Sequence, residues 1–159
     1  MKFFRINIYL SLYDLFISFF YYKNLNNKVS KLLSKYTLKK YNILTSQCRV
    51  SFLIVLKYLK KKFPEKNEII VQSYNLPEMI NVAKILNFKI IYIDIEKISS
   101  SISVDKIIKK ISHKTAAILL TNMFNSIEHS LEIKKICNER DVTLIEDNAI
   151  YFDNFYKSN

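Results

Sequence analysis

Short runs of Ile, Val and Leu alternate with helical segments from residue 46 onward, and this alternation constrains the fold more than any other feature. The apolar runs cover residues 68–73, 89–95, 116–121 and 142–147, and segments with helical spacing cover 48–63, 77–86, 103–111 and 130–139. Such alternation is typical of βαβ units with right-handed crossovers. The sequence therefore predicts an α/β fold, with a mostly parallel sheet and flanking helices.

Residues 1–45 have a different pattern, which predicts a helical extension before the α/β unit. Apolar side chains within residues 12–19 recur at the spacing of one helix face. Residues 3–22 have the length of a membrane span, but an arginine and an aspartate interrupt them. We therefore expect an amphipathic helix that docks on protein. A basic protein associated with an anionic membrane surface stays open as an alternative.

The charge and the cysteines narrow the class of protein. The formal charge is +11, and all of the 25 basic residues except Arg5, Arg49 and Arg140 are lysines. Because arginine makes the bidentate contacts to bases and phosphates, this lysine excess does not favour nucleic-acid binding. Cys48 and Cys137 lack CxxC spacing, which favours a reduced, cytoplasmic protein. The two histidines have no second ligand at metal spacing, so no metal site is expected.

A candidate ligand site lies beyond the carboxyl ends of the predicted strands, where parallel α/β sheets bind their ligands. The residues that follow the strands are Ser73, Tyr74 and Asn75, then Asp94, then Asn122, Met123 and Phe124, and finally Asp147 and Asn148. Gln47, Cys48 and Arg49 open the first long helix of the α/β unit. The unpaired amide groups of a helix N-terminus favour a phosphate there. Such a terminus can also lower the pKa of a thiol, but the sequence offers no partner base for Cys48, so we do not expect a nucleophilic role for it.

Four segments in a fixed order resemble a known family. They read "SQCRVSFLIVL", "EIIVQSYNLPEMINVAKILNFKIIYIDIE", "HKTAAILLTNMFNS" and "VTLIEDNA". Together they resemble the N-terminal half of the large domain of fold-type I pyridoxal-phosphate enzymes, specifically the DegT/DnrJ/StrS-type sugar aminotransferases, over residues 25–157. The resemblance implies that residues 46–159 are an incomplete, cofactor-binding large domain that follows the helical extension of residues 1–45.

The resemblance implies a role for several of the candidate residues. Asp147 falls on the aspartate that pairs with the pyridine nitrogen, where a buried anion holds the ring proton. The phosphate-binding turn falls on Gln47, Cys48 and Arg49. The residue that covers the cofactor ring corresponds to Leu76, and two further positions near the cofactor correspond to Asn122 and Ile150. Arg49 would pair with the phosphate.

The sequence contains no glycine, although the family uses glycine at several turns. In the resemblance these glycines fall on Asn87, Asn125 and Asp141. Asn and Asp are the residues other than glycine that adopt left-handed backbone with the least strain. We therefore expect left-handed backbone at these three positions.

The resemblance also implies a function. A complete family member moves an amino group from an amino acid, typically glutamate, to a keto sugar carried on a nucleotide, as a cytoplasmic homodimer in sugar biosynthesis. The Schiff-base lysine of the family lies beyond the aspartate, and this sequence ends at Asn159 before the matching segment. We thus expect a truncated or split aminotransferase that is inactive alone. A non-catalytic α/β module that needs a partner chain is the alternative.

Overall fold

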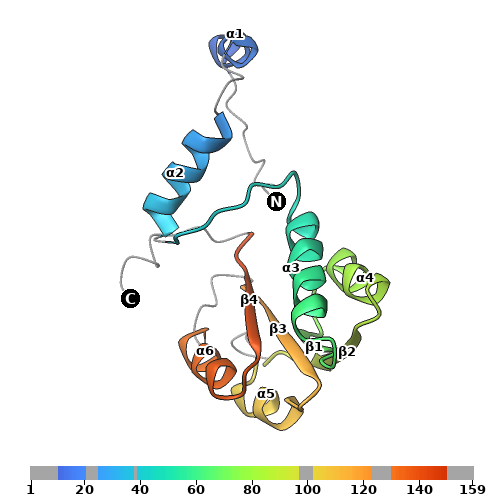
Figure 1. Cartoon of the computed structure of the whole chain (residues 1–159). Helices are drawn as coiled ribbons and strands as arrows, with labels where there is room; N and C mark the ends of the chain where they lie inside the picture. The colour runs from blue at the N-terminus through green and yellow to red at the C-terminus, as the bar shows by residue number, and fades with distance from the viewer. Residues whose placement is uncertain (1–10, 21–24, 38, 97–101, 123–129, 150–159) are drawn as a thin grey trace, which may run out of the picture. The chain divides into compact units, whose positions relative to one another are not determined.

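The computed structural model describes residues 11–20, 25–37, 39–96, 102–122 and 130–149 (Figure 1). These residues form two compact units that divide between Leu44 and Thr45. The first unit contains helices α1 (Leu12–Phe20) and α2 (Leu25–Thr37). Within the described ranges, no helix has both the length and the apolar character needed to cross a membrane. The assignment of residues 46–159 to an incomplete cofactor-binding domain stays a prediction.

The second unit is a parallel four-stranded sheet with helices between its strands, which confirms the predicted fold class. Its strands are β1 (Glu68–Gln72), β2 (Lys89–Ile93), β3 (Thr115–Thr121) and β4 (Thr143–Asp147), and its helices are α3 (Cys48–Lys62), α4 (Pro77–Ile85), α5 (Val104–Lys110) and α6 (Ser130–Glu139). The strand order is β2-β1-β3-β4, and every neighbouring pair is parallel. The carboxyl ends of all four strands therefore meet at one edge.

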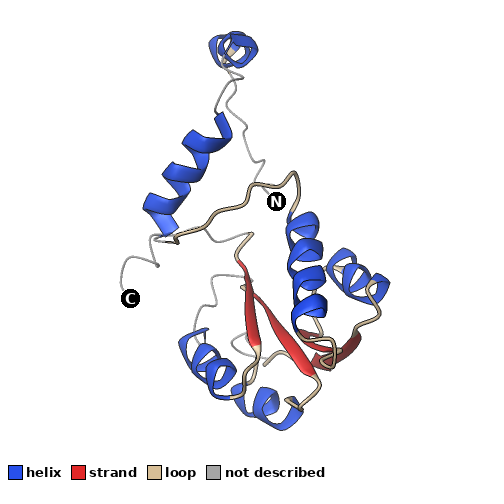
Figure 2. Cartoon of the chain, viewed as in Figure 1, coloured by secondary structure: helices blue, strands red, loops and turns tan. Residues whose placement is uncertain are grey.

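The helices cover both faces of the sheet, as Figure 2 shows. Alternate residues of β1 point to opposite faces. Ile69 packs in a cluster with Leu56 of α3 and Ala83 of α4, whereas Ile70 packs in a second cluster with Ile107 and Ile133, from α5 and α6. Because β1 and β3 are buried along their whole length, the sheet interior is apolar and its polar chemistry is confined to the strand ends.

Two helices end in left-handed residues that are not glycine. Asn87 has φ 57° after α4, and Asp141 has φ 51° after α6. In each case the next residue donates its amide to a carbonyl in the last helical turn, Phe88 to Ala83 at 3.1 Å and Val142 to Cys137 at 2.9 Å. These bonds close a Schellman motif, which needs a left-handed residue. The prediction is confirmed at both positions, and Asn125 lies outside the described residues.

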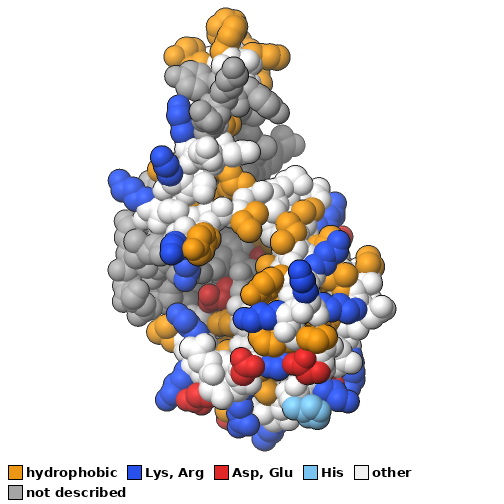
Figure 3. All heavy atoms as spheres, in the orientation of Figure 1, with side chains coloured by type: hydrophobic (Ala, Val, Ile, Leu, Met, Phe, Trp, Pro, Cys, Tyr) orange, Lys and Arg blue, Asp and Glu red, His pale blue; other side chains and the backbone are white. Residues whose placement is uncertain are grey.

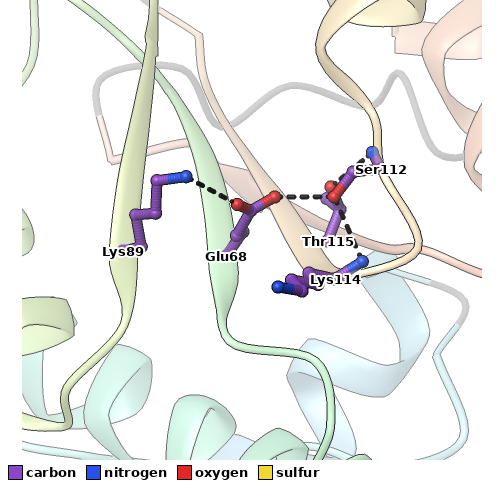
Figure 4. A network of polar contacts seen from close by, with 5 residues as sticks. All are labelled: Glu68, Lys89, Ser112, Lys114 and Thr115. Carbon is purple, nitrogen blue, oxygen red and sulfur yellow. Dashed lines mark hydrogen bonds and ion pairs between the residues drawn. The ribbon is translucent and has the colours of Figure 1, made fainter.

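A buried carboxylate joins three strands at the amino edge of the sheet, opposite the candidate site (Figure 4). Glu68 accepts hydrogen bonds from Lys89 Nζ at 2.9 Å and from Ser112 Oγ at 2.7 Å. The hydroxyl of Thr115 accepts the Ser112 amide at 2.9 Å. These bonds connect the beginnings of β1, β2 and β3. Glu68 is thus explained as a structural residue.

The lysine excess is spread over helix surfaces. Figure 3 shows the side chains of Lys and Arg dispersed over the visible face, with acidic side chains between some of them. Helices α3 and α5 carry the exposed lysines Lys57, Lys60, Lys61, Lys62, Lys106, Lys109 and Lys110. Solvated helix faces account for these lysines without a polyanionic partner.

Candidate functional site

Polar side chains from neighbouring strands meet at the carboxyl edge of the sheet, where the sequence places the candidate site. Ser73 Oγ donates to Asp94 Oδ1 at 3.0 Å, which connects the ends of β1 and β2. Asn75 Nδ2 donates to Thr121 Oγ1 at 3.0 Å, which connects the ends of β1 and β3. The structure thus brings the residues after β1 and β2 into one polar edge with the end of β3.

The ends of β3 and β4 are tied together by Asn122. Its backbone amide donates to the carbonyl oxygen of Asp147 at 3.0 Å, and its side-chain amide donates to Asn148 Oδ1. Asn122 is itself buried. These bonds give Asn122 a structural role, because they fix the backbone that carries Asp147. Its expected place beside a cofactor stays a prediction.

Asp147 is the buried anion of this edge. Its side chain is at the end of β4, and the residue is 6% exposed. Oδ1 accepts a hydrogen bond from the Ala149 amide at 3.1 Å and one from Cys48 Sγ at 3.8 Å. A carboxylate that is withheld from water binds a cationic donor more strongly than one on the surface.

The first turn of α3 contacts this carboxylate, because Cys48 is the first residue of the helix. Gln47 is the N-cap residue, and its side chain makes no capping hydrogen bond. Its carbonyl accepts the amides of Val50 and Ser51, at 3.0 and 3.2 Å. The first amide groups of a helix have no intrahelical partner, so they can bind an anion. Arg49 is exposed in this turn, where the helix dipole disfavours a cation.

The pKa of the Cys48 thiol is raised, although the thiol lies at a helix N-terminus. Burial raises the pKa of Cys48, and the charge of Asp147 and the hydrogen bond to it raise this pKa further. The thiol is therefore a donor to Asp147 and not a reactive thiolate. A sequence cannot show this, because the carboxylate lies 99 residues away along the chain.

Leu76 follows the end of β1 and begins α4 as its N-cap residue. Its amide donates to Asn75 Oδ1 at 2.7 Å, and the residue is 54% exposed. It therefore offers apolar surface at the edge that carries Asp147. Met123, Phe124 and Ile150, which the sequence also indicates, lie outside the described residues. Among the residues that the structure describes, no three His, Cys, Asp or Glu side chains gather as metal ligands.

Gln72 is a residue of this edge that the sequence analysis did not identify. Its side chain is buried, and Oε1 accepts the Thr121 amide at 2.7 Å. The Gln72 side chain thereby gives the Thr121 backbone amide, at the end of β3, the acceptor that a neighbouring strand would otherwise provide. A polar residue that ends the apolar run "EIIVQ" was the available signal.

Comparison with known proteins identifies the family. The sequence model of the DegT/DnrJ/EryC1/StrS aminotransferase family matches residues 19–157. The chain belongs to this family. The resemblance seen in its sequence motifs is therefore confirmed, and the four-stranded sheet is the part of the family fold that the described residues contain.

Named relatives of this family member include a GDP-4-keto-6-deoxy-D-mannose 3-dehydratase from Yersinia pseudotuberculosis, which is 27% identical over 123 residues, 75% of this chain and 31% of the relative. A solved structure of the E. coli GDP-4-keto-6-deoxy-D-mannose-3-dehydratase with hydrated PLP has a TM-score of 0.68 and 24% identity, and covers 77% of this chain and 32% of that one. The ntda protein of Bacillus subtilis with bound PMP has a TM-score of 0.69 and 27% identity, with coverages of 77% and 28%. The chain spans about a third of the length of these proteins.

The residues of this aminotransferase-family chain fit pyridoxal phosphate at both of its charged ends. Asp147 offers a buried carboxylate to a protonated ring nitrogen. The first turn of α3 offers amide groups and Arg49 to a phosphate. The Cys48 contact shows that these two parts of the edge are adjacent. The individual roles of Gln47, Cys48, Arg49, Leu76, Asn122 and Asp147 stay predictions.

Proposed function

We propose that this chain provides the pyridoxal-phosphate-binding edge of an enzyme that acts on a keto sugar carried on a nucleotide. Family membership supports the cofactor, and relatives named for a GDP-linked keto sugar support the substrate class. The observation that carries the proposal is the buried carboxylate of Asp147 beside the first turn of α3. The family reaction is amino transfer from an amino acid, typically glutamate.

Different residues of the carboxyl edge would bind different parts of the cofactor. Pyridoxal phosphate, when bound, supplies the electron sink that stabilises negative charge at the reacting carbon. Asp147 holds a proton on the ring nitrogen, because a buried carboxylate favours the cationic form of its partner. The α3 amides and Arg49 bind the phosphate. Leu76 packs over the ring, and Asn122 holds the Asp147 backbone in place.

We propose that residues 1–159 bind the cofactor without forming the Schiff base, because none of their lysines falls on the family's Schiff-base position. An active assembly would then be a cytoplasmic homodimer or a complex with a complementing chain. Borohydride reduction of the protein with pyridoxal phosphate, followed by peptide mass spectrometry, tests this. We expect scattered low-level labelling of exposed lysines. A stoichiometric adduct at one lysine would contradict the proposal.

Cofactor binding is tested by calorimetric titration with pyridoxamine phosphate, whose amine cannot react with surface lysines. Asp147→Asn should weaken binding by about ten-fold or more, because the ring nitrogen loses its charged partner. Glu146→Gln is the matched control, since it removes an exposed carboxylate from the neighbouring residue. Equal affinity for the wild type and Asp147→Asn would show that Asp147 does not bind the ring.

The second candidate function is a non-catalytic module that binds a partner chain. It is favoured by β4, which is an edge strand of the described sheet and carries the half-buried residues Leu144 and Ile145. A parallel sheet is ordinarily buried at such positions, so a further strand would fit there. Co-purification with a chain that carries the family's lysine would support this function. A monodisperse monomer that captures no such chain would count against it.

A further inference from the structure

Cys48 and Asp147 lie in contact although 99 residues separate them in the sequence. Cys48 Sγ lies 3.8 Å from Asp147 Oδ1, a distance at which a thiol donates to a carboxylate oxygen. The same oxygen accepts the Ala149 amide at 3.1 Å. Since Asp147 is buried, these donors solvate Oδ1 in place of bulk water.

The Cys48 thiol must be protonated to donate a hydrogen bond to Asp147. Burial, then the charge of Asp147 and the hydrogen bond to it, raises the pKa of Cys48. At neutral pH the sulfur therefore keeps its proton and remains a donor. Cys48 is the first residue of α3, so its side chain also occupies space between the helix N-terminus and the end of β4.

We propose that the Cys48 thiol is an internal competitor for Asp147 Oδ1, which weakens the binding of a protonated ring nitrogen at this carboxylate. The inference rests on the proposed function. Oδ1 already has two donors, so a ring N–H at that oxygen must displace the thiol. A thiol is a weak donor, so the ring N–H can displace it from Oδ1. The free energy of the lost thiol bond is subtracted from that of cofactor binding. Cys48 thus determines affinity and is not a catalytic residue.

The test compares the affinity of pyridoxamine phosphate for the wild type and Cys48→Ala by calorimetry. Removal of the thiol should tighten binding by about five-fold, the equivalent of one ordinary hydrogen bond. Cys137→Ala is the control, because it removes a thiol from the apolar cluster under α6. Inorganic phosphate should bind the wild type and Cys48→Ala equally, because the competition concerns the ring nitrogen.

A second measurement tests the contact without any cofactor. The rate of Cys48 alkylation by iodoacetamide is followed against pH by mass spectrometry in the wild type and in Asp147→Asn. Loss of the neighbouring charge should shift the midpoint to lower pH. An unchanged midpoint would overturn the contact.

The two proposals fail in different ways. If pyridoxamine phosphate binds the wild type and Cys48→Ala equally, the competition is overturned and the cofactor-binding function stands. If it binds neither protein, the cofactor-binding function fails and the competition fails with it.

Discussion

Lys66 connects the turn before β1 to the turn before β4 by donating twice to Asp141. Its Nζ lies 2.9 Å from Asp141 Oδ2 and also donates to the Asp141 carbonyl oxygen. The Lys66 side chain is 11% exposed, whereas the Asp141 side chain is 80% exposed. Both bonds lie at the surface, because Asp141 is exposed although the Lys66 side chain is largely covered.

Lys66→Ala should lower the free energy of unfolding more than Asp141→Asn does. The alanine loses both bonds to Asp141, whereas Asp141→Asn keeps the carbonyl acceptor for Lys66 and tolerates the left-handed backbone. Urea unfolding followed by circular dichroism measures both values. Lys61→Ala, on the exposed last turn of α3, is the control. An Asp141→Asn loss as large as that of Lys66→Ala would show that the ion pair dominates.

Asn87→Ala should destabilise the protein by about 1 kcal/mol, because alanine lacks the short polar side chain that lets asparagine adopt left-handed backbone with little strain. Asn87→Gly should be as stable as the wild type or more so. Thermal unfolding distinguishes these outcomes. Asn81→Ala is the matched control, since Asn81 is exposed inside α4 and alanine suits a helix better there. Equal stability of Asn87→Ala and Asn87→Gly would contradict the role assigned to φ 57° at this position.

Glu68 should make stability depend on pH in the acid range. The hydrogen bond from Ser112, followed by that from Lys89, lowers the pKa of Glu68 from its ordinary value of 4.5, against the opposing effect of burial. Because the folded pKa is below the unfolded one, the ionised carboxylate stabilises the protein above the unfolded pKa. That contribution is lost as the pH falls through the folded pKa.

Urea unfolding of the wild type and Glu68→Gln from about pH 7 to about pH 3 measures this dependence. The wild type should be the more stable protein at neutral pH, and the difference should shrink as the pH falls below about 4.5. Glu78→Gln, an exposed carboxylate in the first turn of α4, is the control. A difference that stays constant over the whole range would contradict the lowered pKa of Glu68.

Gln72→Met should destabilise the protein by about 1–3 kcal/mol, because the buried Thr121 amide then lacks its acceptor. The side-chain volume hardly changes, so the effect reports the hydrogen bond and not a cavity. Gln47→Met is the matched control, since Gln47 is exposed and makes no capping bond. Chemical denaturation of both variants gives the comparison. Equal losses would indicate a general cost of replacing glutamine.

Cys137 should resist alkylation in the folded protein. Burial raises the pKa of the Cys137 thiol to about 11, so almost no thiolate is present at pH 8. Iodoacetamide labelling with and without urea, read by peptide mass spectrometry, should label Cys137 only after unfolding. Labelling of Cys137 at equal rates with and without urea would show that the apolar cluster around Cys137 is accessible to the reagent in the folded protein.

The sequence predicts the sheet, the strand ends and the left-handed turns, because each depends on local pattern. Ile-rich runs define the strands, and the type of residue at Asn87 and Asp141 reveals the backbone there. The contact between Cys48 and Asp147 and the bond from Thr121 to Gln72 depend on strand register and on the packing of α3. No local pattern encodes these two contacts, so the sequence does not reveal the raised pKa of Cys48.

The contact between Cys48 and Asp147 has a consequence for how the protein is made. Cys48 leaves the ribosome early, and β4 must be synthesised before the carboxylate can meet it, 99 residues later. The candidate site therefore cannot exist on a nascent chain that lacks β4. Alkylation of Cys48 should consequently be fast on shorter nascent chains and slow once β4 has joined the sheet. The alkylation rate of this thiol therefore reports when β4 joins the sheet during synthesis.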